Sequence, residues 1–156
     1  MPNATVYNPQ KLNRKVLFRG CEFGYNTYPT DFDAVFNVRG EINIIVDAKE
    51  AGKDPVFGQT ITYINMSKAI ESGGTPAYVI WVEHSPNDTE IKLADCIVSL
   101  VWHRGKWIKK QDIIDLYGET LTYRQFQDLL MHRHEVKPYD PKIHKFSKEE
   151  YYPPRS

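Results

Sequence analysis

The stretches FDAVFNV, at residues 32–38, and INIIVDA, at residues 42–48, decide the fold of this chain. Both are rich in β-branched and aromatic residues, which favour β-strands. They are joined by Arg39-Gly40-Glu41, and a short loop that contains glycine is typical of a β-hairpin. Residues 42–46 are almost continuously apolar, which indicates a central strand covered on both faces.

Helical and strand patterns follow the hairpin. Apolar residues at helical spacing predict a helix over residues 57–71, which Gly73-Gly74 would end. The other expected elements are a strand at 77–83, a strand at 94–102, a turn at Gly105, a short helix at 111–117 and a helix from a Thr122–Gln125 capping box to about 132. This order predicts an α/β or α+β class, and we expect a single α/β domain in which helices flank a mixed central β-sheet.

The length of 156 residues is usual for one domain. Residues 1–136 are expected to form it, and residues 137–156, rich in proline, tyrosine and charge, to form a surface tail. No apolar run approaches the ~20 residues that span a membrane, and residues 1–10 lack the apolar core of a secretion signal. We therefore expect a cytoplasmic protein with no membrane partner, whose two cysteines, Cys21 and Cys96, are buried and reduced.

The net charge is zero, but the charges are unevenly distributed. Residues 31–100 carry eleven Asp and Glu against five Lys and Arg, whereas residues 101–156 carry eleven Lys and Arg against eight Asp and Glu. A nucleic-acid binder usually has a stronger basic character. An acidic centre can nevertheless hold a divalent metal while basic flanks meet phosphate.

Asp47-Ala48-Lys49 lies at the end of the second hairpin strand. Residues two apart in a strand point to the same face, so Asp47 and Lys49 should project together. In a hairpin that turns near Gly40, Asp33 falls in register with Asp47, so two carboxylates and a lysine should converge. The alternative is a surface salt bridge, since Asp-x-Lys is common.

This arrangement suits the hydrolysis of phosphodiesters. Two carboxylates can hold Mg²⁺ and leave other positions to water and phosphate. The metal polarises the phosphate and lowers the pKa of a bound water. Lys49 can orient or deprotonate that water, or stabilise the charge that builds up on phosphorus, and the sequence does not choose between these roles.

The segment at residues 30–36 (TDFDAVF), the hairpin, and the segment at residues 46–50 (VDAKE) resemble the PD-(D/E)XK nuclease superfamily, which has the restriction-endonuclease-like fold. The resemblance covers about residues 18–102. It implies that Asp33 and Asp47 are metal ligands and that Lys49 is catalytic.

The resemblance also implies further site residues. Gly58-Gln59 with Tyr63 is similar to the helix motif that follows the catalytic lysine, and it would bring Gln59 to the metal-bound water or the scissile phosphate. Glu22 is the one match for an upstream acidic metal ligand. A literal Pro-Asp pair is absent, so Asp31 is an alternative to Asp33.

The expected function is a nuclease dependent on Mg²⁺ or Mn²⁺, with DNA favoured over RNA as the nucleic acid. The chain resembles the Holliday junction resolvase branch in size and in its Asp-Ala-Lys-Glu stretch, which implies a homodimer. The alternative is a catalytically inactive nuclease-fold module that binds nucleic acid or a protein partner.

Other residues admit two interpretations each. A loop role is favoured over metal binding for His84 and Asp88. His132 and His134 are two apart on a helix and should not form a metal pair. Core packing is favoured over base stacking for Trp102, Trp107 and Tyr117. The basic residues at 103–106, with Lys109-Lys110, could contact phosphate or form a solvated turn.

Overall fold

The computed structural model describes residues 32–151, 153 and 154. The chain divides into two compact units, residues 1–31 and residues 32–156, and every described residue belongs to the second. Cys21, Glu22 and Asp31 therefore lie outside the described residues.

The β-hairpin is present, as predicted. Strands β1 (Ala34–Val38) and β2 (Ile42–Glu50) pair antiparallel. The turn spans Arg39, Gly40 and Glu41, since Val38 pairs with Ile42, and both Arg39 and Gly40 have positive φ angles, 51° and 71°. The Glu41 N–H donates to the Val38 carbonyl at 2.8 Å and closes the turn. Glycine at the second turn position avoids the strain that a Cβ meets there.

The remaining strands complete a five-stranded sheet in the order β1-β2-β3-β4-β5. Helix α1 (Phe57–Ser72) links β2 to β3 (Ala77–His84), and these two strands are parallel. The other elements are η2 (Leu93–Asp95), β4 (Ile97–His103), β5 (Lys106–Lys109), α2 (Lys110–Tyr117), α3 (Tyr123–Arg133) and α4 (Lys148–Tyr151). Strands β4 and β5 add antiparallel, so the sheet is mixed.

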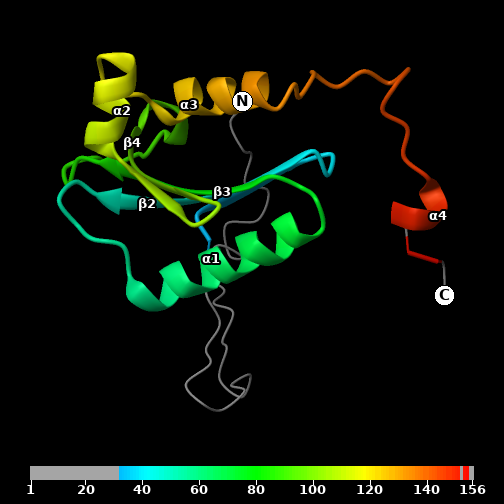
Figure 1. The fold of residues 1–156 in the computed structure, drawn as a ribbon, viewed down its shortest axis with the longest axis horizontal. Coiled ribbons are helices and arrows are strands. Elements are labelled where there is room, and N and C mark those ends of the chain that lie inside the picture. Colours follow the sequence, from blue (N-terminus) through cyan, green and yellow to red (C-terminus); the bar gives the residue numbers. More distant parts are fainter. Residues whose placement is uncertain (1–31, 152, 155–156) are drawn as a thin grey trace, which may run out of the picture. The chain divides into compact units, whose positions relative to one another are not determined.

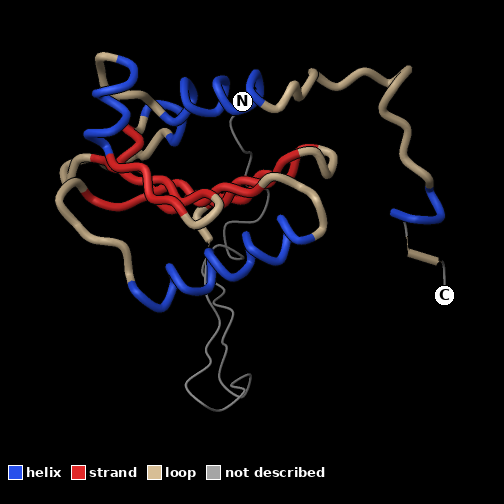
Figure 2. Tube along the Cα trace, in the orientation of Figure 1, coloured by secondary structure: helices blue, strands red, loops and turns tan. Residues whose placement is uncertain are grey.

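Helices cover both faces of the sheet (Figures 1 and 2). Helix α1 lies along one face, and α2 and α3 lie on the other. The expected α/β class, with a mixed sheet flanked by helices, is confirmed for the second unit.

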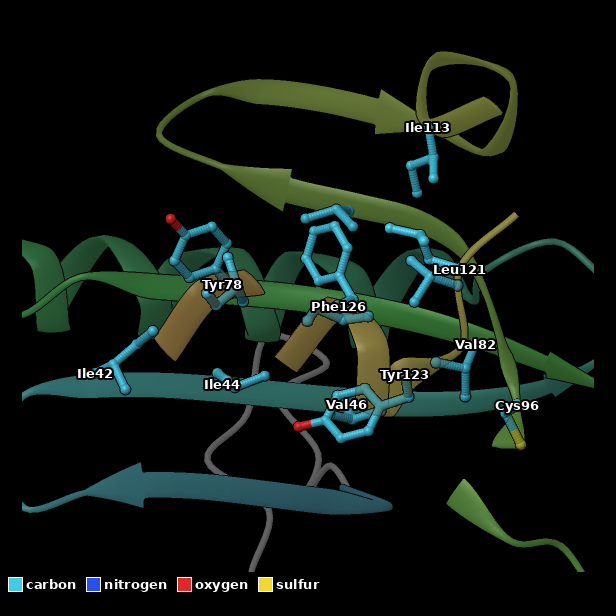
Figure 3. Close-up of a cluster of buried hydrophobic side chains, with 14 residues drawn as sticks. Ile42, Ile44, Val46, Tyr78, Val82, Cys96, Ile113, Leu121, Tyr123 and Phe126 are labelled. Carbon is cyan, nitrogen blue, oxygen red and sulfur yellow. The ribbon is translucent and has the colours of Figure 1, made fainter. Parts of the chain in front are cut away.

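Strands β2 and β3 carry the core on both faces, because each is apolar at successive positions. Ile44, Val46 and Tyr78 face α3, where they pack with Phe126 and Tyr123 (Figure 3). On the opposite face, Ile45, Val79, Trp81 and Trp102 pack with Tyr63 of α1. Cys96 is buried and free, as expected.

The side of helix α1 that packs on the sheet is not the side that holds most of its apolar residues. Its buried residues are Tyr63 and Ser67, whereas Phe57, Ile61 and Met66 are exposed. Tyr63 provides one large anchor against Trp81, with ring centroids 6.3 Å apart, and the small Ser67 allows close approach to the sheet.

One predicted boundary was wrong, and the structure adds one short helix. The strand expected from residue 94 begins at Ile97, because Leu93–Asp95 forms a 3-10 turn first. The tail contains the short helix α4, which the sequence pattern did not indicate.

Candidate active site

The hairpin register brings Asp33 and Asp47 together. The last paired residues of β1 and β2 are Ala34 and Val46, so Asp33 and Asp47 occupy the next pair of positions. Asp33 Oδ2 accepts a hydrogen bond of 2.7 Å from the backbone N–H of Ala48. This bond ties the exposed Asp33 carboxylate to the end of β2.

Asp47 is a buried carboxyl group in apolar surroundings. It is 4% exposed, and in the parallel register it lies beside Trp81 on the sheet face that α1 covers. Burial raises the pKa of Asp47 first, a hydrogen bond with the Asp33 carboxyl raises it further, and Lys49 opposes both, so that the pKa reaches about 6. The Asp47 carboxyl therefore holds its proton to a higher pH than an ordinary aspartic acid does.

Lys49 connects Asp47 to helix α1. Its Nζ lies 3.2 Å from Asp47 Oδ2 and donates to Gln59 Oε1 at 3.3 Å. Gln59 lies in the first turn of α1, so the loop at residues 51–56 brings the start of the helix back to the end of β2. The structure thus brings Asp33, Asp47 and Lys49 together, as the hairpin geometry predicts, and it adds Gln59, which the family resemblance implied.

One oxygen of this group lacks a well-aligned hydrogen bond. Asp47 Oδ2 meets no hydrogen-bond criterion in the described part of the chain, although the Lys49 ammonium lies 3.2 Å away as an ion-pair partner. A buried carboxylate oxygen without a donor is costly to keep in water-free surroundings. The Lys49 ammonium compensates its charge, and a metal ion or a proton would add the direct bond that it lacks.

The donor set fits Mg²⁺ or Mn²⁺, which prefer carboxylate oxygens and water. Among the described residues, no group of three or more His, Cys, Asp or Glu side chains gathers at one place. Mg²⁺ commonly takes one or two carboxylates and completes its coordination with waters and substrate phosphate. Asp33 and Asp47 supply that number, and the third expected ligand, Glu22, lies outside the described residues.

Sequence reasoning missed Glu83 beside this group, and it named Lys110 only as a residue that could contact phosphate. Lys49 and Glu83 are neighbours in the parallel register of β2 and β3 and share a sheet face. Lys110, at the start of α2, donates to Glu83 Oε1. An acidic residue at the end of the second buried strand was the available signal, but the sequence does not reveal which strands are neighbours.

The structure separates most of the other candidates from the site. Asp88 has the loop role that was favoured, since its Oδ2 accepts from the Ser85 N–H at 3.0 Å. His84 is instead the last residue of β3, and its Nδ1 lies 3.0 Å from the Ser85 carbonyl. His134 Nε2 lies 2.6 Å from the Tyr78 hydroxyl, whereas His132 is exposed.

The expectation for the aromatic residues was only partly right. Trp102 is buried, as expected, but Trp107 and Tyr117 are each 45% exposed. Trp107 lies on the edge strand β5, where it packs against Trp81 with the rings tilted by 34° and their centroids 5.6 Å apart. Trp107 is exposed because an edge strand has no neighbouring strand on one side to cover the ring. Tyr117 is exposed at the end of α2, just before Gly118.

Comparisons with protein-family models, with curated proteins and with solved structures give no match. Within residues 32–151, no helix combines the length and the apolar character needed to cross a bilayer.

The pairing of the two carboxyl groups gives a direct test of the geometry. Replacing Asp33 with Asn should lower the pKa of Asp47 below about 6, because the variant removes the hydrogen-bonding acid and its charge. Carboxyl carbon chemical shifts, followed by NMR during a pH titration, measure this. Asp128→Asn, an exposed change on α3, is the control. An unchanged titration of Asp47 in Asp33→Asn would show that the two carboxyl groups do not interact.

Proposed function

We propose that this protein is a metal-dependent nuclease with a restriction-endonuclease-like fold. The observation that carries the proposal is the convergence of Asp33, Asp47, Lys49 and Gln59 at one end of the hairpin, with one buried carboxylate oxygen lacking a well-aligned hydrogen bond. The resemblance of the sequence to the PD-(D/E)XK superfamily supports the same assignment.

Asp33 and Asp47 are the residues that would hold Mg²⁺ or Mn²⁺. The ion would polarise the scissile phosphate and lower the pKa of an attacking water. Because Asp33 is exposed and Asp47 is buried, the exposed side of the pair is the side that a phosphodiester can approach.

Lys49 and Gln59 act on the substrate side of the carboxylates. The Lys49 ammonium, held between Asp47 and Gln59, can orient the attacking water or stabilise charge that develops on the phosphate oxygens. Gln59 fixes the position of Lys49 and offers its amide N–H₂ group as a further donor to phosphate. Both roles depend on the first turn of α1 staying beside β2.

We propose DNA rather than RNA as the substrate, and a homodimer as the active form. The rival is a binding module that keeps the fold without cutting, which the small number of described carboxylates favours. Binding of Mn²⁺ separates the two, because a ligand that binds only the folded state raises its thermal stability.

The decisive experiment is a cleavage assay on plasmid, single-stranded DNA, a four-way DNA junction and RNA, with Mg²⁺, with Mn²⁺ and with EDTA. We expect cleavage only with metal. Lys49→Met keeps most of the buried aliphatic volume and removes the charge, so it should lower cleavage by at least ~10²-fold. The matched control is Lys68→Met, an exposed lysine of α1, which should cut at the wild-type rate.

The nuclease proposal fails if none of these substrates is cut and Mn²⁺ does not raise the melting temperature. If Mn²⁺ stabilises the protein but nothing is cut, the metal site stands and the function moves to the binding module. Equal losses in Lys49→Met and Lys68→Met would remove Lys49 from the mechanism.

A further inference from the structure

A pocket of about 420 Å³ opens beside Lys49 on the sheet face that α1 covers. Its walls come from the end of β2, the loop that follows it, strands β3 and β4, the end of β5 and the start of α2. Lys49 belongs both to this pocket and to the carboxylate group described above. The pocket therefore begins one side chain away from Asp47.

Four lysines line this pocket: Lys49, Lys53, Lys109 and Lys110. Lys49 pairs with Asp47, and Lys110 pairs with Glu83. Within the described part of the chain, Lys53 and Lys109 have no acidic partner in an ion pair. Two ammonium groups are thus available to an anion, although Glu50, Asp54 and Glu83 also line the pocket and limit its positive charge.

A buried donor in the wall of the pocket also lacks an acceptor. Trp81 lines the pocket and is 1% exposed, and its indole Nε1–H has no hydrogen-bond partner among the described residues. A buried N–H without an acceptor costs about 1–3 kcal/mol. An oxygen atom bound in the pocket could satisfy it.

An irregularity of the sheet shapes the same wall. The register of β3 and β4 shifts between Trp81 and Val82, so that Ser99 is left without a paired residue. Ser99 lines the pocket, and its hydroxyl donates to the Trp81 carbonyl at 3.1 Å. Bulges of this kind are frequent beside functional sites, where they redirect a side chain.

We propose that this pocket binds a backbone phosphate of the substrate strand, next to the scissile phosphate. The inference rests on the proposed nuclease function, and it adds which residues hold the nucleic-acid strand during cleavage. Lysines at this position act as point charges on phosphate, which fixes the strand without reading bases. The bound substrate is therefore a nucleic-acid strand recognised independently of its sequence.

The test is the binding of a fluorescent single-stranded oligonucleotide in EDTA, followed by anisotropy at several salt concentrations. The variant is Lys53→Ala with Lys109→Ala. We expect at least ~10-fold weaker binding, and a salt slope reduced by about 0.7 for each phosphate that the variant no longer neutralises. The control is Lys106→Ala, an exposed lysine of β5 that lies outside this pocket and on the other sheet face, which should change neither quantity.

Trp81→Phe tests the unpaired donor separately. It keeps an aromatic ring and removes the N–H, so we expect binding to weaken about 3-fold or more while the protein still unfolds cooperatively. Unchanged binding in both Trp81→Phe and the double lysine variant overturns the proposal, whatever the cleavage assay shows.

Competition by pyrophosphate distinguishes a strand from a free anion. We expect pyrophosphate to displace the oligonucleotide only at a far higher phosphate concentration. Displacement at equal phosphate concentration would mean a site for a small anion, and it would overturn the proposal. All binding is measured in EDTA, so it does not depend on cleavage. The absence of cleavage with metal would reject the nuclease function, and the binding data would still decide whether the pocket holds a strand.

Discussion

Replacing Asp47 with Asn is expected to abolish metal-dependent cleavage and, in the metal-free protein, to raise stability at neutral pH. Both effects come from one buried carboxylate. As a proposed metal ligand it is required for activity, and its removal should lower cleavage by at least ~10³-fold, about 4 kcal/mol of transition-state stabilisation. As a buried charge it is costly to the fold.

The direction of the pH effect follows from the pKa of Asp47. The folded-state pKa of about 6 lies above the ordinary value of 3.8. Between these values the folded protein binds more protons than the unfolded chain, so stability falls as the pH rises through this window. Above about pH 6 the cost is fully present, and Asn, which is never charged, should recover about 2 kcal/mol of it.

Chemical denaturation in EDTA at about pH 4, 5, 6 and 7 measures this difference. The stability gain of Asp47→Asn should be small at the lowest pH and grow as the pH rises. Asp128→Asn should show no such trend, because Asp128 is exposed on α3. A variant that is less stable than the wild type at neutral pH would contradict the burial argument, even if its cleavage activity were lost.

Replacing Ile80 with Ala is expected to destabilise the fold by about 3 kcal/mol. Ile80 is 0% exposed and belongs to β3, the middle strand of the sheet, where it packs in the cluster between the sheet and α3. The loss combines the transfer of the removed carbon atoms with the cavity that remains.

Ile91→Ala is the matched control, because it removes the same atoms from a side chain that is 46% exposed. We expect a change of less than about 0.5 kcal/mol there. Urea denaturation, compared by the transition midpoint at constant slope, gives both values. Similar costs at the two positions would show that β3 is not the centre of the core.

The hairpin and its carboxylates were predictable because they depend on local pairing. Alternation with a period of two, the short glycine-containing loop at residues 39–41 and the spacing of Asp33 and Asp47 determine which residues meet across β1 and β2. Asp47 and Lys49 share a face for the same reason. The α/β class was predictable from the alternation of apolar strands with one long helix.

Contacts between elements that are distant in sequence were not predictable in this way. The parallel pairing of β2 with β3 places Glu83 beside Lys49. No spacing in the sequence specifies such a register, because many residues and a whole helix separate the partners.

The sequence by itself determined the hairpin, the strand that ends in Asp47 and the shared face of Asp47 and Lys49, since each follows from the geometry of neighbouring residues. Only the tertiary structure decided that Gln59 reaches Lys49, that α1 packs through Tyr63 and Ser67, and that Asp47 is buried. Burial raises the pKa of that carboxyl, and burial is a property of the packed sheet and helix together.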